Sequence, residues 1–185
     1  MASAQASKFP PDQLKVHLVL NKQQFRLGEP IELKVEILNA SQKPLLIANE
    51  IYLSSGLVSY LEPELSDSRG PISPRGAIIS DRFSPLEKKS ASETVLNFFL
   101  LLRPETSFVE RFKLFDLFDT FGYVLHPGTY SLKAYYSSNG LFYPPAYQML
   151  GLTEEDVNSL PFQAWHGKLA TNEVSFRILP VAKKQ

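Results

Sequence analysis

The stretch that decides the fold is residues 31–37, Ile-Glu-Leu-Lys-Val-Glu-Ile. Apolar and charged side chains alternate along it, as in a β-strand with one face on a core and the other in water. A helix would instead place its apolar residues three and four positions apart. Similar alternation occurs over Leu14–Leu20, Tyr130–Ala134 and Val174–Ile178. The chain is therefore predicted to be mainly β.

Turn residues separate these predicted strands. Gly28 and Pro30 bend the chain before residue 31, Asn39–Pro44 leads into a short strand at Leu45–Ala48, and His126-Pro127-Gly128 precedes another. Two further strands are predicted within Gly76–Asp81 and Glu93–Leu102. Antiparallel strands without intervening helices favour an immunoglobulin-like antiparallel β-sandwich of about seven to nine strands.

One corner of the chain carries a more specific pattern. Gly128-x-Tyr130-x-Leu132 has the layout of the tyrosine corner of immunoglobulin-like sandwiches. A buried phenol needs a hydrogen-bond partner, and a backbone carbonyl across the corner can supply it. We expect this bond at Tyr130; the alternative is a tyrosine that only packs.

The 185 residues are predicted to form one domain. Residues 1–12 are expected to be a flexible lead-in, and residues 13–182 a single sandwich with insertions at about 50–92 and 137–171. The first insertion contains a Ser, Pro, Arg and Gly-rich segment, Ser66–Gly76, expected to be an exposed loop. The second contains a predicted short helix, Thr153–Leu160, with Thr153 as its cap.

Composition excludes several classes of protein. Nineteen Lys and Arg balance nineteen Asp and Glu, so no basic excess is present for nucleic-acid binding. No apolar run approaches the ~20 residues of a membrane span. The absence of cysteine excludes disulfides. Residues 1–12 lack the pattern of a secretion signal, so we expect a cytoplasmic protein, or a periplasmic or extracellular one if a signal peptide has been removed.

Two segments resemble a known family. Phe25-x-Leu27-Gly28-Glu29-x-Ile31, continued to Asn39-x-Ser41, resembles a bacterial immunoglobulin-like module and is similar to the bacterial intracellular proteinase inhibitor family. That family also has a corner like Pro127–Tyr130, and the matches cover roughly a quarter of the chain. The resemblance implies the sandwich fold and, more weakly, proteinase inhibition. The long Ser137–Thr171 insertion departs from the family. Asn39-Ala40-Ser41 also forms a glycosylation sequon, which we interpret as turn chemistry.

Catalytic and metal-binding patterns are weak. His17, His126 and His166 have no partner at a diagnostic spacing, so we predict neither an enzyme nor a cofactor. Asp116 and Asp119, followed by His126, offer oxygen ligands for calcium, but without the ligand density of a calcium loop. A solvated turn is the favoured interpretation, and no metal site is predicted.

The second insertion is rich in aromatic residues. The candidate binding residues are Tyr143, Tyr147, Phe162, Trp165 and His166. Aromatic side chains on loops stack on sugars or anchor protein partners, so the expected ligand is a protein or a carbohydrate. The alternative is that they form a packed core which holds the insertion on the sheet.

The Ser66–Gly76 segment offers Arg69 and Arg75 as residues that could face a protease. The function expected from the sequence is a non-catalytic binding or protein-interaction module of bacterial type. One alternative is a proteinase-inhibitor-like domain, and another is a β-sandwich enzyme with an unidentified active site. The oligomeric state is not predicted.

Overall fold

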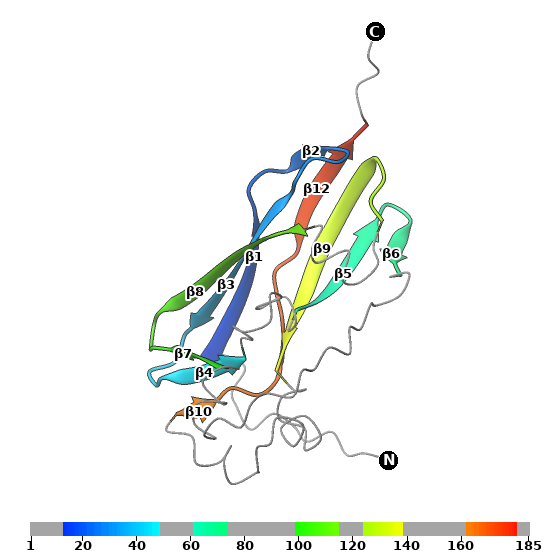
Figure 1. Ribbon diagram of the computed structural model, residues 1–185. Helices are drawn as coiled ribbons and strands as arrows, with labels where there is room; N and C mark the ends of the chain where they lie inside the picture. Colours follow the sequence, from blue (N-terminus) through cyan, green and yellow to red (C-terminus); the bar gives the residue numbers. More distant parts are fainter. Residues whose placement is uncertain (1–12, 49–60, 74–98, 115–123, 139–161, 181–185) are drawn as a thin grey trace, which may run out of the picture.

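A computed structural model describes residues 13–48, 61–73, 99–114, 124–138 and 162–180 (Figure 1). This part of the chain is mostly β-strand and contains no helix. The strands are β1 (Leu14–Leu20), β2 (Gln24–Arg26), β3 (Glu32–Asn39), β4 (Leu45–Ala48), β5 (Leu61–Asp67), β6 (Gly70–Ile72), β7 (Phe99–Leu102), β8 (Ser107–Lys113), β9 (Gly128–Ser137), β10 (Gln163–Ala164), β11 (Lys168–Ala170) and β12 (Val174–Leu179). The all-β prediction is confirmed, and so are the strands expected from alternation.

The strands form three sheets. One has the order β1-β3-β8, a second β10-β4-β7, and the third β2-β12-β9-β5-β6, with β11 also paired to β9. The longest strand, β9, lies between β5 on one side and β11 and then β12 on the other. Figure 1 shows β1, β3 and β8 beside the long strands β12, β9 and β5, with the small sheet at one end.

The sheets share one hydrophobic core. The inward residues of β3, including Leu33 and Val35, belong to the same buried cluster as Leu132 of β9 and Phe176 of β12. Tyr130 stacks on Phe176 with ring centroids 5.5 Å apart, and Phe25 meets Phe176 edge to face at 6.3 Å. Burial of these side chains supplies the main driving force for folding.

Several expectations are corrected by the structure. The pairs β2–β12 and β10–β4 are parallel, so the sheets are not antiparallel throughout. The loop expected at Ser66–Gly76 is wrong for the residues that complete β5 and form β6, whereas Ser68 and Arg69 between them form an exposed turn. Within the expected 137–171 insertion, β10 and β11 are strands of the sheets. The expected Gly76–Asp81 strand and Thr153–Leu160 helix lie outside the described residues.

The predicted tyrosine hydrogen bond is confirmed. The Tyr130 hydroxyl donates to the His126 carbonyl at 2.7 Å and accepts the His126 N–H at 2.9 Å. The Tyr130 hydroxyl therefore fixes the start of β9 to the backbone of His126, four residues earlier.

Asn39 plays the turn role expected of it, and it does so from a fully buried position. Its Nδ2 donates to the carbonyls of Lys43 at 2.8 Å and Leu102 at 3.0 Å. Its Oδ1 accepts from the N–H and hydroxyl of Ser41. All the hydrogen-bonding capacity of a buried amide is thus satisfied, and the side chain joins the β3–β4 turn to β7.

Candidate functional site

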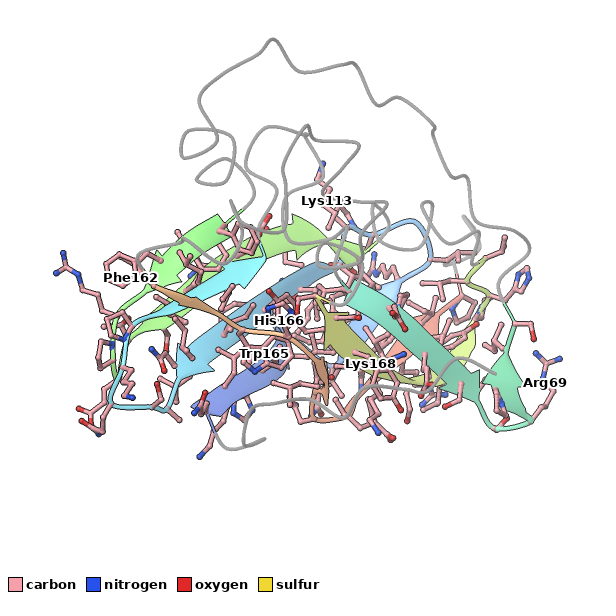
Figure 2. The ribbon with its side chains drawn as sticks, turned by 90° about the horizontal axis from the view of Figure 1, so that it is seen from below. Arg69, Lys113, Phe162, Trp165, His166 and Lys168 are labelled. Atoms are coloured by element: carbon pink, nitrogen blue, oxygen red, sulfur yellow. The ribbon has the colours of Figure 1, made fainter. Side chains whose placement is uncertain are left out.

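Trp165, an expected binding residue, lies in the core with 2% of its surface exposed (Figure 2). Its ring stacks on Tyr136 of β9 with centroids 5.5 Å apart. Its backbone N–H donates to the Leu46 carbonyl at 2.8 Å, and its backbone carbonyl accepts from the Ser138 hydroxyl at 2.9 Å. Trp165 therefore joins β4 to β9, which matches the packed-core alternative.

The residue after His166 makes this close packing feasible. Gly167 has a φ of +152°, and a Cβ there would lie 3.0 Å from Cζ2 of the Trp165 ring. Its N–H donates to the Ser138 hydroxyl at 3.2 Å. A side chain at this position would press on the buried indole and would adopt a φ that residues other than glycine rarely adopt, so glycine is favoured here.

Of the other candidate binding residues, the structure describes Phe162 and His166, and both are more exposed than Trp165. Phe162 is 38% exposed, and Figure 2 shows it at one end of the molecule. His166 is half-buried, and burial lowers the pKa of its imidazole below the usual value. Tyr143 and Tyr147 lie outside the described residues. Trp165 points into the core whereas Phe162 is accessible to solvent.

Arg69 lies at the tip of the β5–β6 hairpin, and its side chain is 85% exposed. Its guanidinium binds Asp67, with Nη2 2.6 Å from Oδ2, and its backbone N–H donates to Asp67 Oδ1 at 2.8 Å. These bonds hold the pKa of the Asp67 carboxyl below its usual value. Arg69 is thus accessible, but it is engaged within its own turn. Arg75 lies outside the described residues.

The histidines are dispersed over the described part of the chain. His17 is exposed on β1, and His126 is exposed where its backbone meets Tyr130. Over residues 13–48, 61–73, 99–114, 124–138 and 162–180, no group of three or more His, Asp or Glu side chains could hold a metal ion. Asp116 and Asp119 lie outside these ranges.

A feature that sequence reasoning missed is the edge of β1 opposite β3, which pairs with no other strand among the described residues and is called the free edge of β1 below. The Gln13 backbone carbonyl accepts from the Ala40 N–H at 2.9 Å, next to the antiparallel β1–β3 pairing. Because backbone groups alternate in direction along a strand, the odd-numbered residues of β1 direct theirs to β3. The even-numbered residues direct theirs to the opposite side. At Leu18 these groups are bonded, because Asn172 Oδ1 accepts the Leu18 N–H at 2.8 Å and Asn172 Nδ2 donates to the Leu18 carbonyl at 3.0 Å.

Asn172 reaches β1 from a break between β11 and β12. At this break Thr171 continues the pairing with β9: its N–H donates to the Ala134 carbonyl at 2.9 Å, and its hydroxyl accepts the Ala134 N–H at 3.0 Å. Two consecutive residues therefore connect β9, in one sheet, to β1, in another.

A groove runs along the remaining free edge of β1. It has a volume of about 290 Å³ and is lined by Leu14, Lys15, Val16 and His17 on one side and by Leu169, Ala170, Thr171 and Asn172 on the other. The backbone N–H and C=O groups of Leu14 and Val16 face this side. Donors, acceptors and apolar surface together make the groove suited to binding another polypeptide.

No protein-family model matches the chain, and no curated protein matches it. In the described ranges there is also no helix with the length and apolar character needed to cross a membrane.

Proposed function

We propose that this chain is an immunoglobulin-like β-sandwich that acts as a non-catalytic protein-interaction module of bacterial type. The strand order supports the fold assignment. With β1, β3 and β8 as strands A, B and E, and β12, β9, β5 and β6 as G, F, C and C′, the pairing follows the immunoglobulin arrangement.

The tyrosine corner gives independent support for this fold. In immunoglobulin-like sandwiches the corner tyrosine lies near the start of strand F and bonds backbone a few residues upstream. Tyr130 lies near the start of β9, the strand assigned as F, and bonds His126.

The observation that carries the binding function is the groove beside β1. It combines backbone hydrogen-bonding groups with the apolar side of Leu169 and Ala170. A partner protein can satisfy both kinds of surface at once. A carbohydrate ligand has less support, because Trp165, the best stacking residue in the chain, is buried.

Site-specific photo-crosslinking tests this proposal. A photoreactive amino acid replaces Lys15, which lines the groove, and a matched control carries it at Arg111, an exposed residue of β8 on the same three-stranded sheet. In cells that produce the protein, we expect a discrete adduct with another protein from position 15 and none from position 111. Adducts of equal yield from both positions, or none from position 15, would contradict the proposal.

A proteinase-inhibitor-like domain is the second candidate, and the exposure of Arg69 favours it. Trypsin-like proteases select arginine with a carboxylate in their specificity pocket. The Asp67 carboxylate already binds the Arg69 guanidinium, so a protease would have to replace this contact. Stoichiometric inhibition of trypsin that is lost in Arg69→Ala would support this candidate. Simple cleavage after Arg69 would contradict it.

A further inference from the structure

We propose that the free edge of β1 binds an extended segment of a partner protein, which adds to the sheet as a short strand carrying acidic side chains on its outer face. This inference rests on the proposed interaction function and specifies the partner's conformation and charge.

The hydrogen-bonding groups of β1 define the extended conformation. Leu14 and Val16 are two residues apart, so their outward N–H and C=O groups repeat at about 7 Å along the strand. An added β-strand presents complementary groups at the same repeat, whereas a helix satisfies its own backbone groups internally. Their side chains face the core, so the partner meets backbone here.

Asn172 shows that this edge accepts an amide partner. Its side chain occupies the place of a strand at Leu18, donating one bond and accepting the other. The same contact closes the edge at Leu18. The docked segment therefore pairs with Leu14 and Val16 and ends before Asn172, and the groove volume of about 290 Å³ suits a segment of a few residues.

The charge of the groove indicates the partner's side chains. Lys15 and His17 are exposed, and they are the charged or titratable residues among its lining. Side chains directly opposite them on an added strand lie within reach of a cross-strand pair. Acidic residues at these positions complement Lys15, while small apolar residues on the inner face meet Leu169 and Thr171.

The other edge of this three-stranded sheet is less suited to docking. β8 differs from β1 because Glu110 stands opposite the buried Val35, in the inward-facing row of the strand. An inward-pointing charged side chain on an edge strand is a device that discourages strand addition.

Amide hydrogen exchange by NMR gives the first test. In the free protein, we expect the Leu14 and Val16 amides to exchange much faster than those of Lys15 and His17, which bond β3. Equal protection of all four amides would show that the edge is closed and would overturn the proposal.

Peptide selection gives the second test. A displayed library of random octapeptides is selected against the full chain, and the enriched peptides are synthesised and titrated by NMR. We expect acidic, alternating sequences whose binding protects the Leu14 and Val16 amides. N-methylation of alternate peptide residues on the bonding edge should abolish binding. Failure to enrich any peptide, or binding mapped elsewhere, would overturn the proposal.

Charge reversal provides the matched variants. Lys15→Glu should weaken the selected acidic peptides about two- to fivefold, whereas Arg111→Glu on β8 should leave their affinity unchanged. Equal effects of the two variants would contradict the placement at β1. If peptides fail to bind although position 15 crosslinks a protein, the strand-addition model fails while the interaction function stands.

Discussion

Asn39 shows how one buried residue can organise a turn. Its Nδ2 donates to the carbonyls of Lys43 and Leu102, which are 59 residues apart in the chain. Its Oδ1 accepts from Ser41. Since Nδ2 is the atom that would carry a glycan and it donates two internal bonds, the folded protein uses the sequon as a structural element. The turn interpretation of Asn39-Ala40-Ser41 agrees with this geometry.

Replacement of Asn39 should be costly. Asn39→Ala removes a donor from the Leu102 and Lys43 carbonyls and the acceptor of the Ser41 N–H, and the Lys43 carbonyl keeps only the Ser41 hydroxyl. We expect the free energy of unfolding to fall by about 2–4 kcal/mol. Urea unfolding followed by fluorescence of Trp165, the single tryptophan, measures this. Gln42→Ala, which removes an exposed bond to Glu105, is the control and should change stability by less than about 0.5 kcal/mol.

Removal of one hydroxyl tests the tyrosine corner. Tyr130→Phe retains the stacking on Phe176 but loses both bonds to His126, so we expect a loss of about 1–3 kcal/mol in unfolding free energy. Tyr135→Phe, on the solvent face of the same strand, keeps its ring beside Lys133 and Lys168 and should be nearly neutral. Equal stability of the two variants would show that Tyr130 only packs.

His166 should give stability a pH dependence. Burial lowers its pKa in the folded state, so below the unfolded value of about 6.5 the unfolded chain binds more protons. The contribution of neutral His166 to the free energy of unfolding is therefore fully present above about pH 6.5. It is lost as the pH falls from about 6.5 through the folded-state pKa of His166. Unfolding free energies at pH 7.5 and 5.5 should differ less in His166→Gln than in the wild type.

At the scale of elements, the segment from β10 to β12 combines short strands with side chains that extend them. β10 has two residues and β11 three, and Thr171 and Asn172 continue the pairing by their side chains. The stacking of Trp165 on Tyr136 and the bonds of the Ser138 hydroxyl to Trp165 and Gly167 hold this segment on β9.

A pair of glycine variants separates backbone strain from collision. Gly167→Ala places a methyl group against the indole, whereas Gly70→Ala, at a φ of +120°, meets nothing within 4 Å. Each should lose about 1–3 kcal/mol from strain, and Gly167→Ala should lose at least about 1 kcal/mol more from the collision. Chemical denaturation measures both. A similar loss in the two variants would show that the core yields around Trp165.

Strands were predictable where one face is apolar and the other polar, as in β1, β3, β9 and β12. β8 was missed because Glu110 interrupts its inward row, and β5 because Pro63 lies within it. β2, β10 and β11 are too short for a pattern and depend on distant partners.

The groove had no local signal in the sequence either, since Leu18 and Asn172 are separated by 154 residues. The burial of Trp165 could not be deduced, because a binding aromatic and a core aromatic look alike in sequence.

At the scale of the whole molecule, the three sheets share one core, and the Asn172 bridge also links the segment before β12 to the edge of β1. The bridge also shortens the open edge of β1. An edge strand with unpaired backbone groups is a template for association, so this one side chain bears on both stability and solubility.

Loss of the bridge should promote self-association. Asn172→Ala frees the N–H and C=O of Leu18 and adds a third open position beside Leu14 and Val16. Sedimentation velocity over a range of concentrations should show more of the larger species than in the wild type. Glu173→Ala, a change at the adjacent exposed residue, is the control. Identical sedimentation of all three proteins would contradict a protective role for Asn172.

The β5–β6 hairpin also has a practical consequence. Its tip, Ser68 and Arg69, is exposed, is closed by the Asp67–Gly70 pair, and lies at the opposite end of the molecule from Phe162 in Figure 2. Exposed loop tips tolerate foreign sequence. An affinity tag, or a short peptide that carries a fluorophore, inserted between these two residues would label the native protein while leaving the β1 groove accessible to a partner.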